Sequence, residues 1–310
     1  MTFNAGHTYT DRARTAGSVL AHLATHHPHD SLAEWRARIL AGEVEVDGRQ
    51  AGPDDPLSPG QTVAWHRPPW DEPDVDLAVA LLYEDEALLA VRKPRGLPTL
   101  PGGGFLAHTL LARVRARYPE ARPMHRLGRG TSGLVLFART ADAAARLQAD
   151  WRDHAIRKTY RALASGACPQ AAFRVEAPIG PVPHPRLGTL HAASPEGRPA
   201  ASEVRVLALR EDGTLAEVDI ETGRPHQIRI HLAWAGHPLV GDPLYGPGGL
   251  PLPDGAAVPG DGGYWLHAFR LDLRHPLDGR PLHLEAPPPP RLALPSEAPW
   301  PGLPEFNNYL

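Results

Sequence analysis

The spacing of apolar positions predicts two helices in the chain. The first begins after Ser31, an N-cap residue with which Glu34 can complete a capping box, and Gly42 is a natural stop. Four apolar residues fall on one side of this helix, namely Leu32, Trp35, Ile39 and Leu40. The second helix is expected over residues 141–156, with Ala144, Leu147 and Trp151 on one face.

Alternating and continuous apolar stretches predict β-strands around these helices. Residues 134–138 form a continuous apolar run, which is typical of a buried strand. Further strands are expected at residues 43–46, 61–65, 78–83, 88–91, 160–164 and 217–221. Asp47-Gly48 is a hairpin signal and Pro59-Gly60 marks a second turn.

Changes in composition divide the chain into five segments. We expect an N-terminal tail (1–14), a small α and β unit (15–66), a Pro-rich linker (67–76), a larger unit (77–287) and an extended, Pro-rich C-terminal tail (288–310) that mostly lacks regular structure.

Composition indicates a folded protein of the cytoplasm, and we expect a monomer. The 310 residues are 42% hydrophobic, enough to bury a substantial core. No run of 18 apolar residues predicts a membrane span, and residues 1–14 lack the apolar core of a signal peptide. The single cysteine, Cys168, excludes an internal disulfide and supplies no zinc framework.

Charge is distributed unevenly along the chain. The formal net charge is −3, but residues 51–90 hold nine acids and one Arg, whereas residues 121–161 hold nine basic residues and three acids. The second segment is a candidate phosphate-facing surface, although a solvated helix face with ion pairs explains it equally well. Of the 32 basic residues only two are lysines, Lys93 and Lys158, at positions that could favour a compact ammonium.

Residues 125–133 combine three glycines with a Thr-Ser pair directly before the expected buried strand. The segment is neither a Walker loop nor a dinucleotide fingerprint. By itself it is read more simply as a glycine turn that enters a core strand, although its two arginines could contact phosphates.

Three segments together resemble the RluA-type family of RNA pseudouridine synthases: residues 125–133, 158–160 and 222–231. In that family the first segment reads His-Arg-Leu-Asp, two variable residues, then Thr-Ser-Gly, and the Asp is catalytic. Gly128 stands at the position of this Asp. The third match extends to residue 246, about 25 residues in all, with Pro225 and Trp234 as variations. Residues 15–66 resemble an S4-type RNA-binding domain.

The resemblance implies an α+β fold built on a mixed, largely antiparallel sheet with a central RNA cleft, and no cofactor or metal. It implies that Tyr160 stacks on the target base, that Ile228 and Leu127 enclose it, and that Arg229 would pair with the catalytic Asp. The residues expected to contact RNA are His125, Arg126, Arg129, Lys158 and Arg224, with Arg36 and Arg38 from the S4-like domain. Without the resemblance, Tyr160 would be read as a core tyrosine at the start of a strand.

The first functional hypothesis is an RNA pseudouridine synthase that isomerises uridine to pseudouridine in structured RNA, either rRNA or tRNA. The alternative is a catalytically inactive RNA-binding or ribosome-assembly protein that keeps the synthase cleft, because glycine cannot act as a nucleophile. A third reading is a synthase that takes its carboxylate from elsewhere. Asp85, Glu221 and Asp242 are the acids in or near family-like segments that could pair with Arg229.

Overall fold

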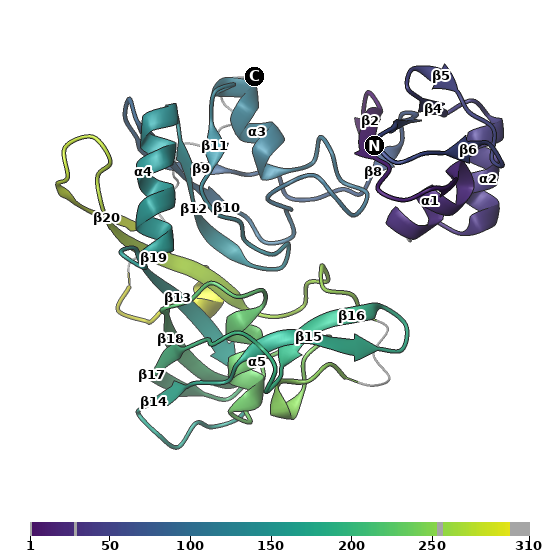
Figure 1. Ribbon diagram of the computed structural model, residues 1–310. Coiled ribbons are helices and arrows are strands. Elements are labelled where there is room, and N and C mark those ends of the chain that lie inside the picture. The colour runs from purple at the N-terminus through teal and green to yellow at the C-terminus, as the bar shows by residue number, and fades with distance from the viewer. Residues whose placement is uncertain (1, 28–29, 253–256, 298–310) are drawn as a thin grey trace. The chain divides into compact units, whose positions relative to one another are not determined.

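The computed structural model describes residues 2–27, 30–252 and 257–297. The chain forms two compact units, Met1–Asp74 and Val75–Leu310, so the boundary falls inside the expected linker at 67–76. Figure 1 labels the elements of both units. No helix in the described ranges is long and apolar enough to cross a membrane.

The N-terminal unit packs two helices with short antiparallel sheets. Its main sheet has the strand order β2-β7-β4-β5. Its elements are β1 (Thr2–Phe3), β2 (His7–Arg12), β3 (Gly17–Ser18), α1 (Val19–His26), α2 (Leu32–Leu40), β4 (Val44–Val46), β5 (Arg49–Gln50), β6 (Pro56–Leu57), β7 (Thr62–Arg67) and β8 (Asp71–Glu72). The expected tail at 1–14 is wrong, because β2 pairs with β7 along its whole length and β1 pairs with β8.

Local signals placed helix α2 correctly, but its buried face is narrower than expected. The capping box between Ser31 and Glu34 is present. Trp35 and Ile39 are buried, whereas the side chains of Leu32 and Leu40 are 60% and 69% exposed. At about 100° per residue Leu40 lies roughly 140° around the helix from Trp35, outside the face that meets the core. Leu32 is the first residue of the helix.

The C-terminal unit is built on one ten-stranded sheet, which Figure 1 shows from β14 to β9. The order is β14-β17-β18-β13-β19-β12-β10-β9, with β11 beside β12 and β20 beside β19. Its strands are β9 (Ala80–Glu84), β10 (Leu88–Lys93), β11 (Arg122–Pro123), β12 (Ser132–Ala138), β13 (Arg157–Ala164), β14 (Ala172–Val175), β17 (Ser202–Arg210), β18 (Gly213–Ile220), β19 (Leu266–Arg274) and β20 (Pro281–Glu285). Only the β12–β19 pair is parallel among these strands, which confirms the expected α+β class with a mixed, largely antiparallel sheet.

Three helices and a separate hairpin complete this unit. They are α3 (Leu110–Arg117), α4 (Ala141–Arg152), α5 (Gln227–Trp234) and the hairpin of β15 (Ile179–His184) and β16 (Gly188–Ala193), with short 3₁₀ turns at Pro247–Gly249 and Pro290–Leu292. Helix α4 ends four residues before the predicted end at Ile156, because His154 adopts a positive φ of 56°. Its residues Ala144 and Leu147 pack into the core, with Trp151 partly buried against it.

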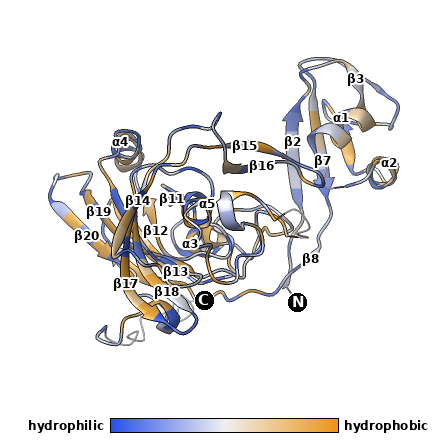
Figure 2. Ribbon diagram, turned by 90° about the horizontal axis from the view of Figure 1, so that it is seen from below, coloured by the Kyte–Doolittle hydropathy of each residue, from blue (hydrophilic) through white to orange (hydrophobic). Residues whose placement is uncertain are grey.

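The parallel contact between β12 and β19 requires glycine at Gly133. A Cβ atom there would lie 2.3 Å from the carbonyl oxygen of Ala268, and φ is 114°. All seven residues of β12 are buried, as expected for a continuous apolar run. Figure 2 shows hydrophobic residues along this strand and along β18.

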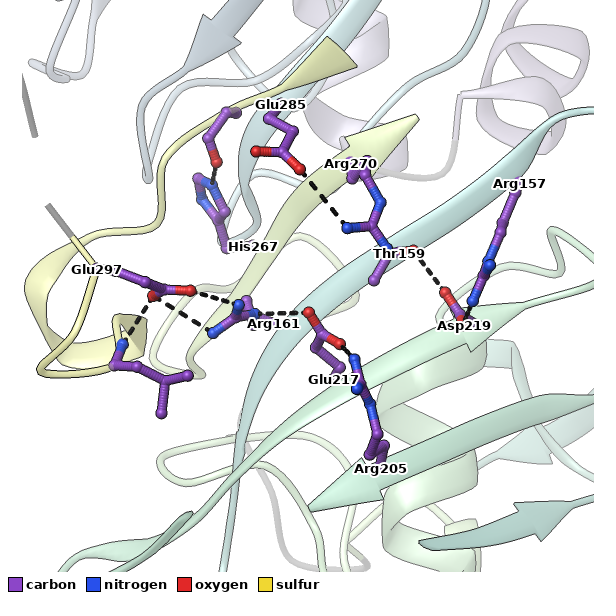
Figure 3. A network of polar contacts seen from close by, with 12 residues as sticks. Arg157, Thr159, Arg161, Arg205, Glu217, Asp219, His267, Arg270, Glu285 and Glu297 are labelled. Atoms are coloured by element: carbon purple, nitrogen blue, oxygen red, sulfur yellow. Dashed lines mark hydrogen bonds and ion pairs between the residues drawn. The ribbon is translucent and has the colours of Figure 1, made fainter. Parts of the chain in front are cut away.

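The side chains of strand β13 point alternately to the two faces of the sheet, and these faces differ chemically. Figure 3 shows Arg157, Thr159 and Arg161 on one face, where Arg161 lies between Glu217 and Glu297 at 3.2 and 2.6 Å. Side chains alternate along a strand, so Lys158 and Tyr160 belong to the opposite face. Glu297 lies in the expected C-terminal tail, and Leu292 there is fully buried. The tail is therefore packed on the sheet up to Glu297, whereas residues 298–310 lie outside the described residues.

Candidate active site

A pocket of about 250 Å³ lies on the face of the sheet that carries Lys158 and Tyr160. Its walls come from the segment before β12, from strand β13, from the start of α5 and from the segment before β19. The sequence-predicted residues that line it are His125, Arg126, Leu127, Gly128, Lys158, Tyr160, Arg224, Ile228 and Arg229. Segments far apart in the sequence thus meet at one site.

Hydrogen bonds hold the segment before β12, which forms one wall of the pocket, against the rest of the protein. The backbone nitrogen and oxygen of Leu127 both bond to the Thr99 hydroxyl, at 3.1 and 2.9 Å. His125 accepts a hydrogen bond from the backbone nitrogen of Leu136 and stacks on Trp151. Burial, with a smaller effect of the Lys158 charge, lowers the pKa of His125 to about 4. His125 is therefore neutral near pH 7 and anchors the loop to β12.

Lys93 holds the same loop from inside the protein. Its ammonium is fully buried and donates to the backbone oxygens of Pro94, Leu97 and Arg129, at 3.0, 2.6 and 3.3 Å. Burial lowers the pKa of Lys93 to about 7. An ammonium with three carbonyl acceptors fits this position, because a guanidinium is larger and planar.

The aromatic ring of Tyr160 lines the pocket. The ring is half-buried, and its hydroxyl makes no hydrogen bond to any described residue. Burial raises the pKa of Tyr160 to about 12, so it stays protonated. Leu127 and Ile228, 7% and 4% exposed, add apolar surface beside it.

The carboxylate that neutralises Arg229 is Asp242. The Arg229 Nε and Nη2 atoms each lie 2.7 Å from an Asp242 oxygen, and the two side chains are 2% and 1% exposed. Of the other two candidates, Asp85 accepts from His275 and Tyr83, and exposed Glu221 pairs with Arg174. Asp242 is thus the one of the three acids that contacts Arg229.

The carboxylate of Asp242 accepts hydrogen bonds on both oxygens, so its role is that of a structural partner of Arg229. Besides its two bonds from the guanidinium, it accepts from the backbone nitrogens of Leu244 and Tyr245 at 2.9 and 3.1 Å. It does not line the pocket. Its carboxylate therefore orients Arg229 from outside the pocket lining.

Tyr264 links this ion pair to the loop, and sequence reasoning missed it. Its ring centroid lies 4.2 Å from the guanidinium carbon of Arg229, and its hydroxyl lies 3.2 Å from the Thr131 hydroxyl oxygen. The side chain is 2% exposed yet lines the pocket. No motif marked this residue, because only the folded chain brings it beside the loop.

Gly128 lines the pocket, and no acid lines it with Gly128 among the described residues. Gly128 has no positive φ, and a Cβ atom added there would lie 3.1 Å from the Tyr264 hydroxyl and 3.8 Å from the Thr131 hydroxyl. The backbone therefore accepts a side chain at position 128 if Tyr264 shifts by a few tenths of an ångström.

The arginines expected to contact RNA differ in their availability. Arg126 is exposed at the pocket and has no hydrogen bond or ion pair within the described chain. Arg224 is half-buried at the pocket and donates to the Pro199 backbone oxygen. Arg129 is outside the pocket lining and pairs with Asp261 at 3.2 Å.

Arg36 and Arg38 belong to the N-terminal unit. Arg36 forms an exposed pair with Asp54, and Arg38 pairs with Asp30 while its guanidinium lies over the Trp65 ring. Arg38 is therefore engaged in holding its own unit together.

The histidines near the pocket are engaged in protein contacts. His226 bonds to the Tyr245 hydroxyl, His231 uses both ring nitrogens on Ser202 and Ala177, and His237 bonds to the Ser165 backbone oxygen. In the described ranges, one group has ligand atoms close enough for a metal ion: Asp11, His22 and His26 of the N-terminal unit, within 4.8 Å of one another. There the His22 and Asp11 side chains share a 2.9 Å hydrogen bond that links α1 to β2.

Comparisons with known proteins identify the family and the fold of this chain. Residues 87–234 match the RNA pseudouridylate synthase family. An uncharacterized RNA pseudouridine synthase of Synechocystis is 46% identical over 86% of this chain and 92% of its own length. Ribosomal large subunit pseudouridine synthase D of Xanthomonas campestris is 36% identical over 89% of this chain and 86% of its own length.

Among solved structures, human RNA pseudouridylate synthase domain containing 1 aligns with a TM-score of 0.54 and 25% identity, over 72% of this chain and 89% of that one. Fold and sequence together define an RNA-modifying isomerase of the pseudouridine synthase class. The chain belongs to the RluA-type family of these enzymes, which isomerise uridine in RNA to pseudouridine.

We predict that Lys93→Met lowers the free energy of unfolding by about 1–3 kcal/mol, because three buried carbonyl oxygens lose their common donor. Urea denaturation measures this change. Arg146→Met, at an exposed position on α4, is the matched control and should stay within about 0.5 kcal/mol of wild type. Equal stability of both variants would show that the carbonyls are satisfied without the ammonium.

A second prediction concerns the buried ion pair. Arg229→Met should destabilise by about 3–5 kcal/mol, because it leaves the Asp242 carboxylate buried and unpaired. Adding Asp242→Asn should recover part of this loss by removing the charge while keeping an oxygen acceptor. Arg174→Met breaks exposed pairs and should cost at most about 1 kcal/mol. If the double variant is as unstable as the single one, the unpaired charge is not the cause.

Proposed function

We propose that this synthase acts on a uridine of ribosomal RNA and binds that nucleotide, turned out of the helical stack, in the pocket beside Gly128. Bases inside a helix cannot reach such a pocket, so the nucleotide must leave the stack. The proposal rests on one observation. The pocket combines an aromatic ring and apolar walls with cationic side chains, and none of its described lining residues is acidic.

The ribosomal substrate is supported by a relative whose name refers to the large ribosomal subunit. We further propose that the N-terminal unit is an S4-like domain that adds RNA contacts, that Arg126 and Arg224 bind phosphates at the pocket, and that the protein works as a monomer in the cytoplasm. An exposed arginine without a protein partner can neutralise a phosphate at little cost. Transfer RNA is the alternative substrate.

A second candidate function follows from Gly128 itself. Without a carboxylate in the pocket lining, the protein could bind the flipped uridine and leave it unmodified, as an RNA-binding or ribosome-assembly factor. The two functions predict the same affinity for RNA and differ in the product. Fold alone cannot decide between them.

We predict that Tyr160→Phe keeps nearly all of the RNA affinity, because the ring is retained and the hydroxyl has no described partner. Tyr160→Ala should weaken binding by about 1–3 kcal/mol through loss of base stacking. Filter binding to ribosomal RNA at fixed salt measures both. Equal losses in the two variants, with lowered thermal stability, would indicate a core tyrosine instead.

The decisive experiment on function compares wild type, Gly128→Asp and Gly128→Asn on ribosomal and transfer RNA, with pseudouridine located by chemical mapping. We expect pseudouridine from the wild type, and a higher rate with Gly128→Asp, because a carboxylate would enter the pocket without a forbidden φ. The Asn side chain of Gly128→Asn has about the size of Asp without its charge, so this variant controls for crowding of Tyr264. Activity in Gly128→Asp alone would support the binding-protein function.

A further inference from the structure

Lys158 is a buried cation that the protein leaves without a partner. The residue is 6% exposed and lines the pocket. It makes no hydrogen bond or ion pair within the described ranges, in contrast to Lys93 with its three carbonyl acceptors. Burying a charge without a partner costs free energy, and burial accordingly lowers the pKa of Lys158. The folded protein therefore carries an unfavourable charge at this point, which a ligand could relieve.

Among the described residues, none that lines the pocket with Lys158 carries a negative charge. Nearby His125 is neutral and uses its Nε2 atom on the backbone of β12. Arg229 already has its carboxylate, which lies outside the pocket lining. A negative charge that reaches Lys158 must therefore come with the bound RNA.

The position of Lys158 favours the base over the phosphate. Lys158 and Tyr160 are two residues apart on β13 and line the same pocket, so their Cα atoms are about 6.6 Å apart. A base stacked on the Tyr160 ring would have one edge within reach of the lysine ammonium. The exposed guanidinium of Arg126 is better placed for the solvated phosphates.

We propose that Lys158 is a catalytic residue that stabilises the negative charge on uracil when its bond to the ribose breaks, an inference that rests on the proposed function. As the N1–C1′ bond breaks, its electron pair stays on N1 and spreads to the carbonyl oxygens of the ring, and C1′ becomes an oxocarbenium ion that C5 later attacks. The ammonium donates a hydrogen bond to this developing anion. After the base turns, C5 bonds to C1′, the C5 proton leaves to solvent and N1 takes one up, so atoms and charge balance.

Such an arrangement is electrostatic catalysis in its simplest form. A donor fixed in a water-poor pocket interacts more strongly with charge that appears in the transition state than with the neutral ground state. It requires no other charged group at the base, which suits a pocket whose loop carries glycine at position 128. Lys158 thus assists departure of the uracil.

The test compares wild type, Lys158→Met and Lys158→Arg in the full chain, with Arg146→Met on α4 as a matched surface control. Single-turnover formation of pseudouridine at saturating protein gives the rate, and filter binding at several salt concentrations gives the affinity and its salt slope. We expect Lys158→Met to lose roughly 100-fold or more in rate. Its affinity should stay within a few-fold of wild type, and Lys158→Arg should recover part of the rate.

Thermal unfolding separates this role from a structural one. Because the charge has no protein partner, Lys158→Met should melt at or above the temperature of wild type. A lysine that supports the fold would instead give a variant that melts lower. RNA carrying 5-fluorouridine adds a chemical test, because fluorine withdraws electrons and stabilises the leaving base. The loss of rate in Lys158→Met, followed as disappearance of 5-fluorouridine, should then be smaller than with uridine.

Three results would overturn the proposal. Weaker binding of Lys158→Met, with a salt slope lower by about 0.9 and an unchanged saturating rate, would make Lys158 a phosphate contact. An unchanged rate and affinity would leave it without a role at the site. A wild type that binds RNA but forms no pseudouridine would overturn the proposed function, and this inference with it. The first two results, obtained with an active wild type, would overturn the inference alone.

Discussion

The buried pair of Arg229 and Asp242 is the interaction on which the pocket depends. It connects α5 to the turn that follows, and the guanidinium supports the Tyr264 ring, which in turn contacts Thr131. Two charges removed from water are stable only when their geometry is nearly ideal and their remaining atoms are bonded. Both conditions are met here, so one carboxylate outside the pocket fixes a wall of the pocket.

This pair also accounts for the unusual electrostatics of the site. Because Asp242 neutralises Arg229 from behind, the pocket needs no acid of its own to tolerate that arginine. Of the other cations that line the pocket, Lys158 and Arg126 have no ion pair within the described residues, and Arg224 contacts only a backbone oxygen. A cavity lined by cations and by no described acid attracts negatively charged ligands.

Sequence patterns were sufficient where structure is determined locally. The capping box at Ser31, the turn at Asp47-Gly48 and the buried run of β12 all depend on neighbouring residues. Strand β2 was missed because Tyr9 is its one apolar side chain, so no apolar alternation marks it, and pairing with β7 is what orders it. Motifs likewise gave most of the pocket lining, but could not identify the acid that meets Arg229 or the tyrosine that covers it. Those two contacts exist only after distant segments have packed.

The place of β19 in the sheet has a consequence for synthesis of the chain. This strand begins at Leu266 and lies between β12 and β13, so within the described sheet it alone joins the strands made earlier on either side. A nascent chain therefore carries two part-sheets with open edges until nearly all of it has been translated. Open edges invite pairing with other chains. The two sides of the pocket, on β13 and on the segment before β12, are therefore joined only after Leu266 has been translated.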